Sequence, residues 1–548
     1  MSNHNPRADV QNGIVQQWSP HHPQLSPRSS QSPPYHDTHN HVTNGHHACG
    51  GRESDAPPTP PITEEDEKLW RDQERNDRIM QIVEESGLCR PKGHKVSFHY
   101  NSGVEDMHFG KTHPMKPWRL TLTKHLVLGF GLQHTMDTYE AVAAGKDQVR
   151  AFHDADYVDF LAQVSPQTFE ELKDIPRFAK HTPFKHEFDS VDLGPFNLST
   201  SPGADCPVFD GMSKYLFLYT GATLAATHQL TSQQSDIAIN WSGGLHHAKK
   251  AEASGFCYIN DIVLAILDML RVYPRVLYID IDVHHGDGVE EAFQRQPRVM
   301  TLSYHRYGPY DDTGHKFFPG TGDVTDVGLK GTVGEHFALN VPIPSGIDDR
   351  QYKNLFEKVT GNAIESFKPS AIVLQCGADS LGGDRLGQFN INIKQHGDCV
   401  SFVKRQQIPL LLLGGGGYTA RNVARAWCHE TALATDNGDN LPDRIPMDLV
   451  PRPEAFQGRA RGEGKLFPPF QRLHPNDCKD DDMEWMIKKL DGDLKYVRNA
   501  PWVQMEQLPR QSVMDRMVEE VDEKMALGKQ ERERRWRERN PAGRGELR

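Results

Sequence analysis

The central part of the chain alternates short apolar runs with stretches of helical periodicity. Between roughly residues 93 and 440, apolar runs of strand length occupy 95–100, 235–240, 275–282, 298–305, 370–377 and 408–415. Stretches with apolar residues at helical spacing lie among them, at 119–132, 260–273, 348–367 and 419–434. Nearly continuous apolar strands separated by such helices predict an α/β fold, a single-domain three-layer sandwich with a mostly parallel central sheet.

The two ends of the chain follow a different pattern. Residues 1–62 are mostly His, Pro, Ser, Gln, Asn and Gly, and this composition buries too little apolar surface to offset the entropy of ordering. Dense charge over 63–90 predicts an exposed helix, and the polar stretch from 441 ends in an Arg-rich run. We therefore expect a disordered extension with a charged helix at its end (1–92), one folded domain (93–440), and a charged tail that is partly helical or disordered (441–548).

Composition and charge exclude several classes of protein. The 548 residues include 62 Lys and Arg against 74 Asp and Glu, a net charge of −12, which argues against general affinity for naked nucleic acid. No apolar run approaches the roughly 18–20 residues that span a bilayer, and the N-terminus is polar where a secretory signal is apolar. The 8 cysteines form no CxxC pair, so neither a zinc finger nor a disulfide framework is indicated. We expect a protein of the cytosol or nucleus.

Two of the predicted strands lead into loops with candidate catalytic side chains. Ligands of parallel sheets bind at the carboxyl ends of the strands, so these loops are the place to look for chemistry. One strand is followed by the adjacent His246 and His247 on a loop with two glycines, which favours a functional role over packing. Another is followed by four glycines and Tyr418. Since the glycine run lacks the Lys and Ser/Thr of a phosphate-binding loop, we interpret it as close backbone approach to a site that receives the Tyr418 hydroxyl.

Two further strand ends carry metal-ligand residue types. Alternation along 275–282 predicts that Asp280, Asp282 and His284 project together, and a later strand delivers Asp379 to the same edge. Burying these groups side by side is costly unless a cation compensates, although a metal-free hydrogen-bonded network is the alternative. Three oxygen and nitrogen donors with an open position are typical of catalytic zinc, and iron(II), cobalt or manganese also suit them.

These groups fit hydrolysis of an amide or related C–N bond. A metal polarises the carbonyl and activates water, one histidine accepts a proton, and the other returns one to the leaving amine. The phenol stabilises the oxyanion. Asp280 and Asp287 remain as partners of the two histidines, which would separate the two imidazole pKa values.

Several longer motifs occur in order along the domain: HPMKPWR, GADCPVFDG, GGLHHAKKAEASGFCYINDI, YIDIDVHHGDGV, FFPGTGD, QCGADSLGGDRLG and LGGGGYTARNVARAW. They resemble the motifs of the class I zinc-dependent histone deacetylases, and the resemblance is closest to fungal relatives of the corepressor-associated isoform. It implies the arginase/deacetylase fold and removal of acetyl groups from histone lysines.

The resemblance also implies roles for individual residues. Zn²⁺ would be held by Asp282, His284 and Asp379. His247 would be the general base and His246 its electrostatic or acid partner, with Asp280 and Asp287 behind them. Tyr418 would bind the acetyl carbonyl. The substrate side chain would contact Gly255, Phe256 and Phe318 along a narrow tube, with Leu386 at the rim. The carboxylate of Asp205 would bind the backbone of the substrate.

Two further sites follow from the resemblance alone. A structural K⁺ would bind at Asp280, Asp282, His284, Ser303 and Tyr304. Inositol tetraphosphate, a possible regulator, would bind at His108, Thr112, Lys116, Arg385 and Arg421, although Thr112 stands where relatives usually have Gly.

The resemblance implies partners as well. Acetylated histone tails and corepressor-complex subunits are expected, without sequence-specific nucleic-acid or membrane binding, in the nucleus with the cytoplasm as a second location. Two other functions stay open. One is a non-catalytic scaffold or acetyl-lysine binder, against which the complete set of catalytic residues argues. The other is ureohydrolase or polyamine-deacetylase chemistry. Ureohydrolases need further carboxylates for a second metal, and Phe256 and Phe318 suit an extended lysine better than a guanidine.

Overall fold

The computed structural model describes residues 16–17, 64–183, 191–201, 203–309, 314–469, 474–498, 521–522, 524–532 and 534–535. The chain divides into two compact units, Met1–Arg498 and Asn499–Arg548. In the second unit the described residues, between 521 and 535, are helical. Apart from residues 16–17, the extension predicted to be disordered (1–62) lies outside the described residues.

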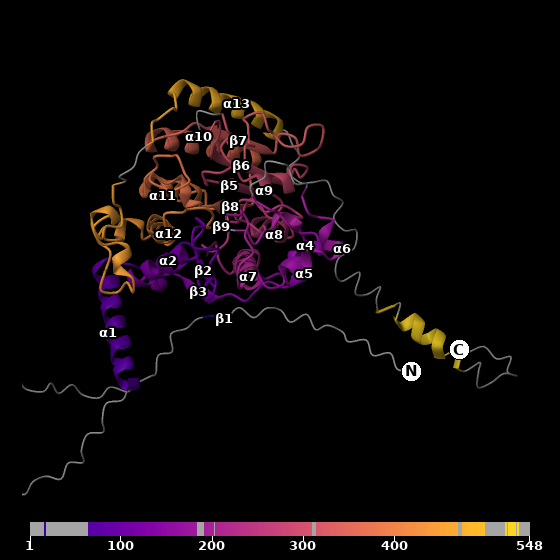
Figure 1. Cartoon of the computed structure of the whole chain (residues 1–548), viewed down its shortest axis with the longest axis horizontal. Coiled ribbons are helices and arrows are strands. Elements are labelled where there is room, and N and C mark those ends of the chain that lie inside the picture. Colours follow the sequence, from indigo (N-terminus) through magenta and orange to yellow (C-terminus); the bar gives the residue numbers. More distant parts are fainter. Residues whose placement is uncertain are drawn as a thin grey trace, which may run out of the picture. The chain divides into compact units, whose positions relative to one another are not determined.

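A nine-stranded sheet forms the centre of the first unit (Figure 1). Eight strands are parallel, in the order β3-β2-β4-β9-β8-β5-β6-β7, and β1 pairs antiparallel with β3 at one edge. The strands are β1 Gln16–Gln17, β2 Val96–Tyr100, β3 Asp137–Glu140, β4 Ile237–Asn240, β5 Val276–Asp280, β6 Val299–Arg306, β7 Ala338–Ile343, β8 Ala371–Gln375 and β9 Leu410–Leu413. All six predicted strands are confirmed. The polar β3 (DTYE) and β7, which is interrupted by Asn340 and Pro342, carry too weak an apolar pattern to be found from sequence.

Helices cover both faces of the sheet (Figure 1). One layer contains α7 Met212–Thr231, α8 Asp261–Met269 and α9 Asp287–Phe293, and the other α2 Trp118–Gly129, α10 Asp349–Phe367, α11 Ile393–Lys404 and α12 Ala420–Ala434. Shorter helices are α3 Lys146–Val149, α4 Ala155–Leu161, α5 Phe169–Lys173 and α6 Pro176–Ala179. None of the described helices has both the length and the apolar character needed to cross a membrane. The predicted three-layer α/β sandwich is confirmed.

The interior between α8 and the sheet shows why this segment folds as predicted. Ile262, Val263 and Ile266 are inaccessible to solvent and pack against Tyr278 of β5 within one apolar cluster. Burying side chains of this size contributes about 1.5–3 kcal/mol each. The side chain of Asn260 caps the helix by accepting a hydrogen bond from the amide of Val263 (3.1 Å). The core thus anchors the loop that precedes α8.

The compact unit extends beyond the range 93–440 expected for the domain. Helix α1 (Glu64–Glu85), predicted as an exposed charged helix, buries Ile79 and Val83, which lie over Gly131. On the C-terminal side, Phe456 and Leu466 are fully buried, and α13 (Asp480–Arg498) packs on α10. The sequence pattern did not predict this packing, because only one face of each helix is apolar and the charged residues of the other face dominate the composition.

Candidate active site

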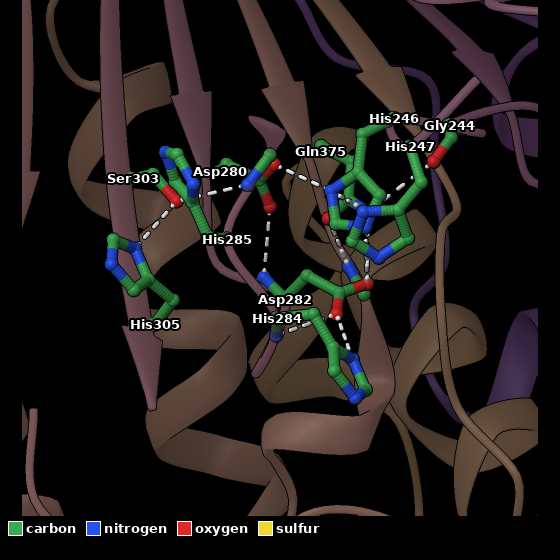
Figure 2. Close-up of polar contacts among 12 residues, drawn as sticks. Gly244, His246, His247, Asp280, Asp282, His284, His285, Ser303, His305 and Gln375 are labelled. Atoms are coloured by element: carbon green, nitrogen blue, oxygen red, sulfur yellow. Dashed lines mark hydrogen bonds and ion pairs between the residues drawn. The ribbon is translucent and has the colours of Figure 1, made fainter. Parts of the chain in front are cut away.

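The candidate catalytic residues follow the carboxyl ends of β4, β5, β8 and β9, and Figure 2 shows those that follow β4 and β5. The predicted alternation along 275–282 is wrong in detail, because β5 ends at Asp280. Asp282 and His284 follow in the loop, and the amide of Asp282 donates to Asp280 Oδ1 (3.1 Å). The loop, not the pleat of a strand, brings the ligand candidates together, and Asp280 is directed toward a different partner.

Asp282, His284 and Asp379 converge as predicted. His284 Nδ1 lies 3.1 Å from Asp282 Oδ1 and 3.1 Å from Asp379 Oδ2. All three side chains are buried, and their ligand atoms lie within 4.8 Å of one another. Burial and the neighbouring Asp282 raise the pKa of Asp379. Two carboxylates and an imidazole at this spacing are arranged to share one cation.

Backbone and amide groups fix the two carboxylates. Asp282 Oδ2 accepts hydrogen bonds from Gln375 Nε2 (2.9 Å) and from the amide of Gly416 (2.8 Å), and Asp379 Oδ1 accepts one from the amide of Val283 (2.9 Å). A Cβ at position 416 would lie 2.1 Å from Asp379 Oδ2, so only glycine fits there. The expected close approach of the glycine-rich backbone is confirmed.

The two adjacent histidines each bind their own carboxylate. His246 Nδ1 lies 2.7 Å from Asp280 Oδ2, and His247 Nδ1 lies 2.7 Å from Asp287 Oδ1. The imidazole centroids are 4.0 Å apart and both side chains are buried. Each carboxylate therefore holds a proton on Nδ1 of its histidine and leaves Nε2 as the nitrogen that can exchange a proton.

The two histidines have different charge states. Burial alone would lower the pKa of His246, but the carboxylates of Asp280 and Asp282 outweigh burial and raise the pKa to about 9. Burial is the largest effect on His247, and the charge of His246 adds to it, so the pKa of His247 falls to about 3 despite Asp287. At neutral pH, His246 is an imidazolium and His247 a neutral imidazole.

Lys249 also binds the carboxylate that holds His247. Lys249 Nζ lies 2.7 Å from Asp287 Oδ2, so the carboxylate is shared between a cation and His247. Asp280 instead accepts a hydrogen bond from the hydroxyl of Tyr278.

Tyr418 lies at the same edge, held through its backbone by a buried carboxylate. Asp384 Oδ2 accepts hydrogen bonds from the amides of Tyr418 (2.7 Å) and Thr419 (3.0 Å). The Tyr418 ring centroid is 6.4 Å from that of His284. Burial, with Asp379 and Asp282, raises the pKa of Tyr418 well above 10, so the phenol keeps its proton and can donate.

Comparison with known proteins identifies the family. Residues 113–434 match the model of the histone deacetylase domain. The chain belongs to the histone deacetylase family. "Probable histone deacetylase 1-B" of Xenopus laevis is 43% identical over 435 residues, covering 78% of this chain and 81% of the relative. "Histone deacetylase 1" of Homo sapiens is 43% identical over 425 residues (76% and 79%), and that of Bos taurus 44% identical over 421 residues (76% and 78%).

Family membership makes the chain a hydrolase and implies zinc, and the donor set fits that metal. The three ligand candidates supply two carboxylate oxygens and one imidazole nitrogen without a thiolate, the class of set that catalytic zinc sites use. Without a cation, two buried carboxylates face each other across a single imidazole, and a divalent ion removes that excess negative charge.

The residues expected to form the walls of the substrate tube lie beside His247 and Tyr418. The Phe318 ring is 5.0 Å from that of His247, and the Phe256 ring is 5.7 Å from that of Tyr418. Gly255 has φ +53°, and a Cβ there would lie 2.3 Å from the His247 ring. Exposed Asp205 accepts a hydrogen bond from the amide of Gly255 (2.7 Å), which ties the outer loop to this wall. Half-buried Leu386 is in the loop of Asp384.

Three of the five expected phosphate-binding residues line one cavity of about 600 Å³ beside Tyr418. They are Lys116, Arg385 and Arg421, and Arg461 joins them from the C-terminal segment. Burial lowers the pKa of Lys116, and the charge of Arg385 adds to this effect. His108 and Thr112 are exposed and do not line the cavity, although Lys116 Nζ donates to the carbonyl of Gly110 (2.7 Å) in the same loop.

The residues expected to bind a monovalent cation lie behind the metal loop. Ser303 Oγ bonds to His305 Nδ1 (2.9 Å) and lies 3.4 Å from the amide of Gly286 (Figure 2). The Tyr304 hydroxyl bonds to Thr360 Oγ1 (2.7 Å), so a contribution of Tyr304 to such a site would come from its main chain.

Sequence reasoning missed several residues that hold the site. Asp261 accepts hydrogen bonds from the amides of Gly244 (2.9 Å) and Leu245 (3.0 Å), which shapes the loop before His246. Asp384 binds the amide of Tyr418, and Gln375 donates a hydrogen bond to Asp282. Lys249 forms an ion pair with Asp287. Asp384 lies in the recognisable motif QCGADSLGGDRLG, which was a usable signal, whereas Asp261 reads as a helix cap.

Proposed function

We propose that the chain hydrolyses N6-acetyl-lysine in histones to lysine and acetate, using zinc. The observation that carries this proposal is a pair of adjacent histidines, each bonded to its own carboxylate and with pKa values of about 9 and about 3, beside three converging ligand atoms. Such a pair supplies an acid and a base at one pH, which hydrolysis of an amide requires.

Zinc bound by Asp282, His284 and Asp379 would supply a Lewis acid that polarises the amide carbonyl and acidifies water. His247, neutral and aligned by Asp287, accepts the proton of the attacking water at Nε2. His246 holds positive charge beside the reaction and acts as its acid or electrostatic partner. Tyr418 donates its hydroxyl proton in a hydrogen bond to the oxyanion that develops on the former carbonyl.

The substrate walls support an extended lysine chain. The rings of Phe256 and Phe318 lie near Tyr418 and His247, and Phe318 is 42% exposed, as expected at an entrance. Gly255 keeps the wall thin beside His247. We assign the lysine methylenes to the space between the two rings, with Asp205 and Leu386 at the rim, because apolar walls favour methylenes over a guanidinium.

We further propose K⁺ and inositol tetraphosphate as accessory ligands. Buried Asp280 and Asp282, with Ser303 nearby, offer the oxygens that a monovalent cation prefers. Lys116, Arg385, Arg421 and Arg461 concentrate positive charge around one cavity, which supports binding of a polyphosphate. His108 and Thr112 would contribute only from the neighbouring loop.

The biological setting is the last part of the proposal. Deacetylation restores the lysine charge and strengthens the contact of histone tails with DNA phosphates, which favours repression in a nuclear corepressor complex. The net charge of −12 supports attraction of basic tails. The closeness to fungal relatives of the corepressor-associated isoform stays a prediction.

Two substitutions test the chemistry on an acetylated histone peptide. Tyr418→Phe removes one oxyanion donor and should lower kcat about 10²–10³-fold. Asp379→Asn should abolish measurable activity together with bound zinc. Tyr496→Phe, at an exposed tyrosine of α13, is the matched control and should keep the native rate. Native rates in both active-site variants would refute the mechanism.

A further inference from the structure

An apolar groove lies at the β3 edge of the sheet and shares no residue with the active site. It has a volume of about 290 Å³ and is formed by β2, β3 and α2. Its lining includes the apolar side chains of Phe98, Val127, Leu128 and Met136, together with Thr138. A concave apolar surface of this size matches a single large side chain.

One polar atom of the groove indicates the chemistry of its occupant. Gln133 lines the groove, and its Oε1 is buried with no hydrogen-bond partner among the described residues. A buried acceptor without a donor is unfavourable. The groove therefore fits a side chain that is apolar over most of its surface and carries one hydrogen-bond donor.

The sheet edge beside the groove already pairs with the N-terminal part of the chain. Strand β1 runs antiparallel to β3, with Gln16 opposite Glu140 and Gln17 opposite Tyr139. If the pairing extended by one residue, Trp18 would be opposite Thr138. The surrounding sequence, Ile14-Val15-Gln16-Gln17-Trp18, has the β-branched and aromatic residues of a strand within an otherwise polar extension.

The register also decides which face Trp18 occupies. Residues directly opposite each other in a sheet point to the same face. Thr138 is opposite Phe98 in β2, and both line the groove on the α2 side. Tyr139, next in the strand, also borders the groove, but its ring stacks on His99 (5.2 Å between centroids), which neighbours Phe98 and points to the opposite face. A side chain opposite Thr138 therefore points into the groove.

We propose that residues 14–18 dock on β3 as an edge strand and that the Trp18 indole fills the groove. Tryptophan has the required chemistry, since it is a large apolar ring with a single N–H donor, and that donor would pair with Gln133 Oε1. The segment covers a sheet edge that could otherwise pair with another chain.

Hydrogen exchange on the full chain tests this docking. In Trp18→Ala, amides in a peptide spanning 136–141 should exchange about tenfold faster or more than in the native protein, because the edge strand detaches. Trp18→Phe, which keeps the ring but loses the donor, should show an intermediate increase. Trp70→Ala, at a tryptophan of α1 with 59% exposure, is the matched control and should leave this peptide unchanged. Equal exchange in Trp18→Ala and native protein would overturn the proposal.

Cross-linking separates this occupant from others. Under mild oxidation, the double variant Trp18→Cys with Thr138→Cys should form a disulfide within one chain. The pair Trp18→Cys with Tyr139→Cys, on opposite faces, should form little. Disulfide-linked dimers in place of the internal bond would mean that a second copy occupies the groove, and equal yields in the two variants would mean that the register is wrong. Either result contradicts the proposal.

Discussion

At the scale of single residues, the active site separates two chemically identical side chains. His246 and His247 are neighbours in sequence, each binds a carboxylate at 2.7 Å, and both are buried. Their pKa values differ because the carboxylates of Asp280 and Asp282 outweigh burial at His246, whereas burial and the charge of His246 dominate at His247. Asp287 also forms an ion pair with Lys249, whereas Asp280 binds His246 and the hydroxyl of Tyr278.

The His246–Asp280 pair predicts a change in the pH profile. Asp280→Asn removes the carboxylate that raises the pKa of His246 to about 9, so His246 should lose its proton at lower pH. If the charged form is required, the alkaline limb of kcat/KM should move down by about one to two pH units. The measurement is kcat/KM between pH 6 and 10.

The contrasting variant is Asp287→Asn. It alters the partner of His247 and should lower the rate while leaving the alkaline limb close to its native position. The same downward shift in both variants would show that the limb does not report on the His246–Asp280 pair.

At the scale of elements, the site depends on where parallel strands end and on how closely their loops approach. Strand β9 ends at Leu413, and the next four residues are glycines. Gly416 lies against both carboxylate ligand candidates, its amide bonded to Asp282 and its α-carbon facing Asp379. No side chain larger than hydrogen leaves this distance intact.

Gly416→Ala should therefore weaken zinc binding without unfolding the sheet. The added Cβ would lie 2.1 Å from Asp379 Oδ2 and 2.8 Å from Asp282 Oδ2, so the ligand set must spread. We expect about 10–100-fold weaker zinc affinity, as when supporting groups of metal sites are lost. Zinc affinity is measured by competition with a chelator, and far-UV circular dichroism reports the fold.

Gly361→Ala is the matched glycine control. Gly361 lies in helix α10, and a Cβ there would meet only Phe402 at 3.7 Å, an ordinary contact. Zinc affinity should be native and the melting temperature unchanged or slightly higher, because alanine favours helix. Native zinc affinity in Gly416→Ala would contradict the crowding argument.

At the scale of the whole molecule, several buried histidines tie stability to pH. Burial lowers the pKa of His153 to about 4, and burial followed by the nearby Lys394 lowers the pKa of His429 to about 4. His153 accepts a hydrogen bond at Nε2 from the amide of Asn260 (2.9 Å), so the neutral ring fits its surroundings. The unfolded chain binds these protons near pH 6.5, so stability is complete above that value and falls as pH drops toward 4.

His429→Leu should remove one part of this pH dependence. His429 packs against Phe467 (4.9 Å between ring centroids), and its Nδ1 is buried without a partner among the described residues, so an apolar side chain is tolerated. Between pH 8 and pH 5 the native protein should lose about 2 kcal/mol more stability than the variant. Urea denaturation at both values measures the difference, and parallel losses would refute the assignment.

Local pattern was enough to predict much of the architecture. The strands around Ile239, Leu277 and Leu412 are buried on both faces and therefore almost wholly apolar, which makes them visible in sequence. Strand β3 is only four residues long and half exposed, and β7 is interrupted by Pro342, so neither carries that signal. Helices α1 and α13 were also missed as parts of the core, because charged residues on their exposed faces outnumber the apolar residues that they bury.

By itself, the sequence determined the α/β class, the strands of the sheet centre, and the set Asp282, His284, Asp379, His246, His247 and Tyr418, because strand ends and ligand chemistry are local. Only the tertiary structure decided that Lys249 pairs with Asp287, that Asp384 and Gln375 hold Tyr418 and Asp282, and that Arg461 joins a basic cavity. These contacts join residues far apart in the chain. Their distances, burial and resulting pKa differences arise from packing and cannot be found in local spacing.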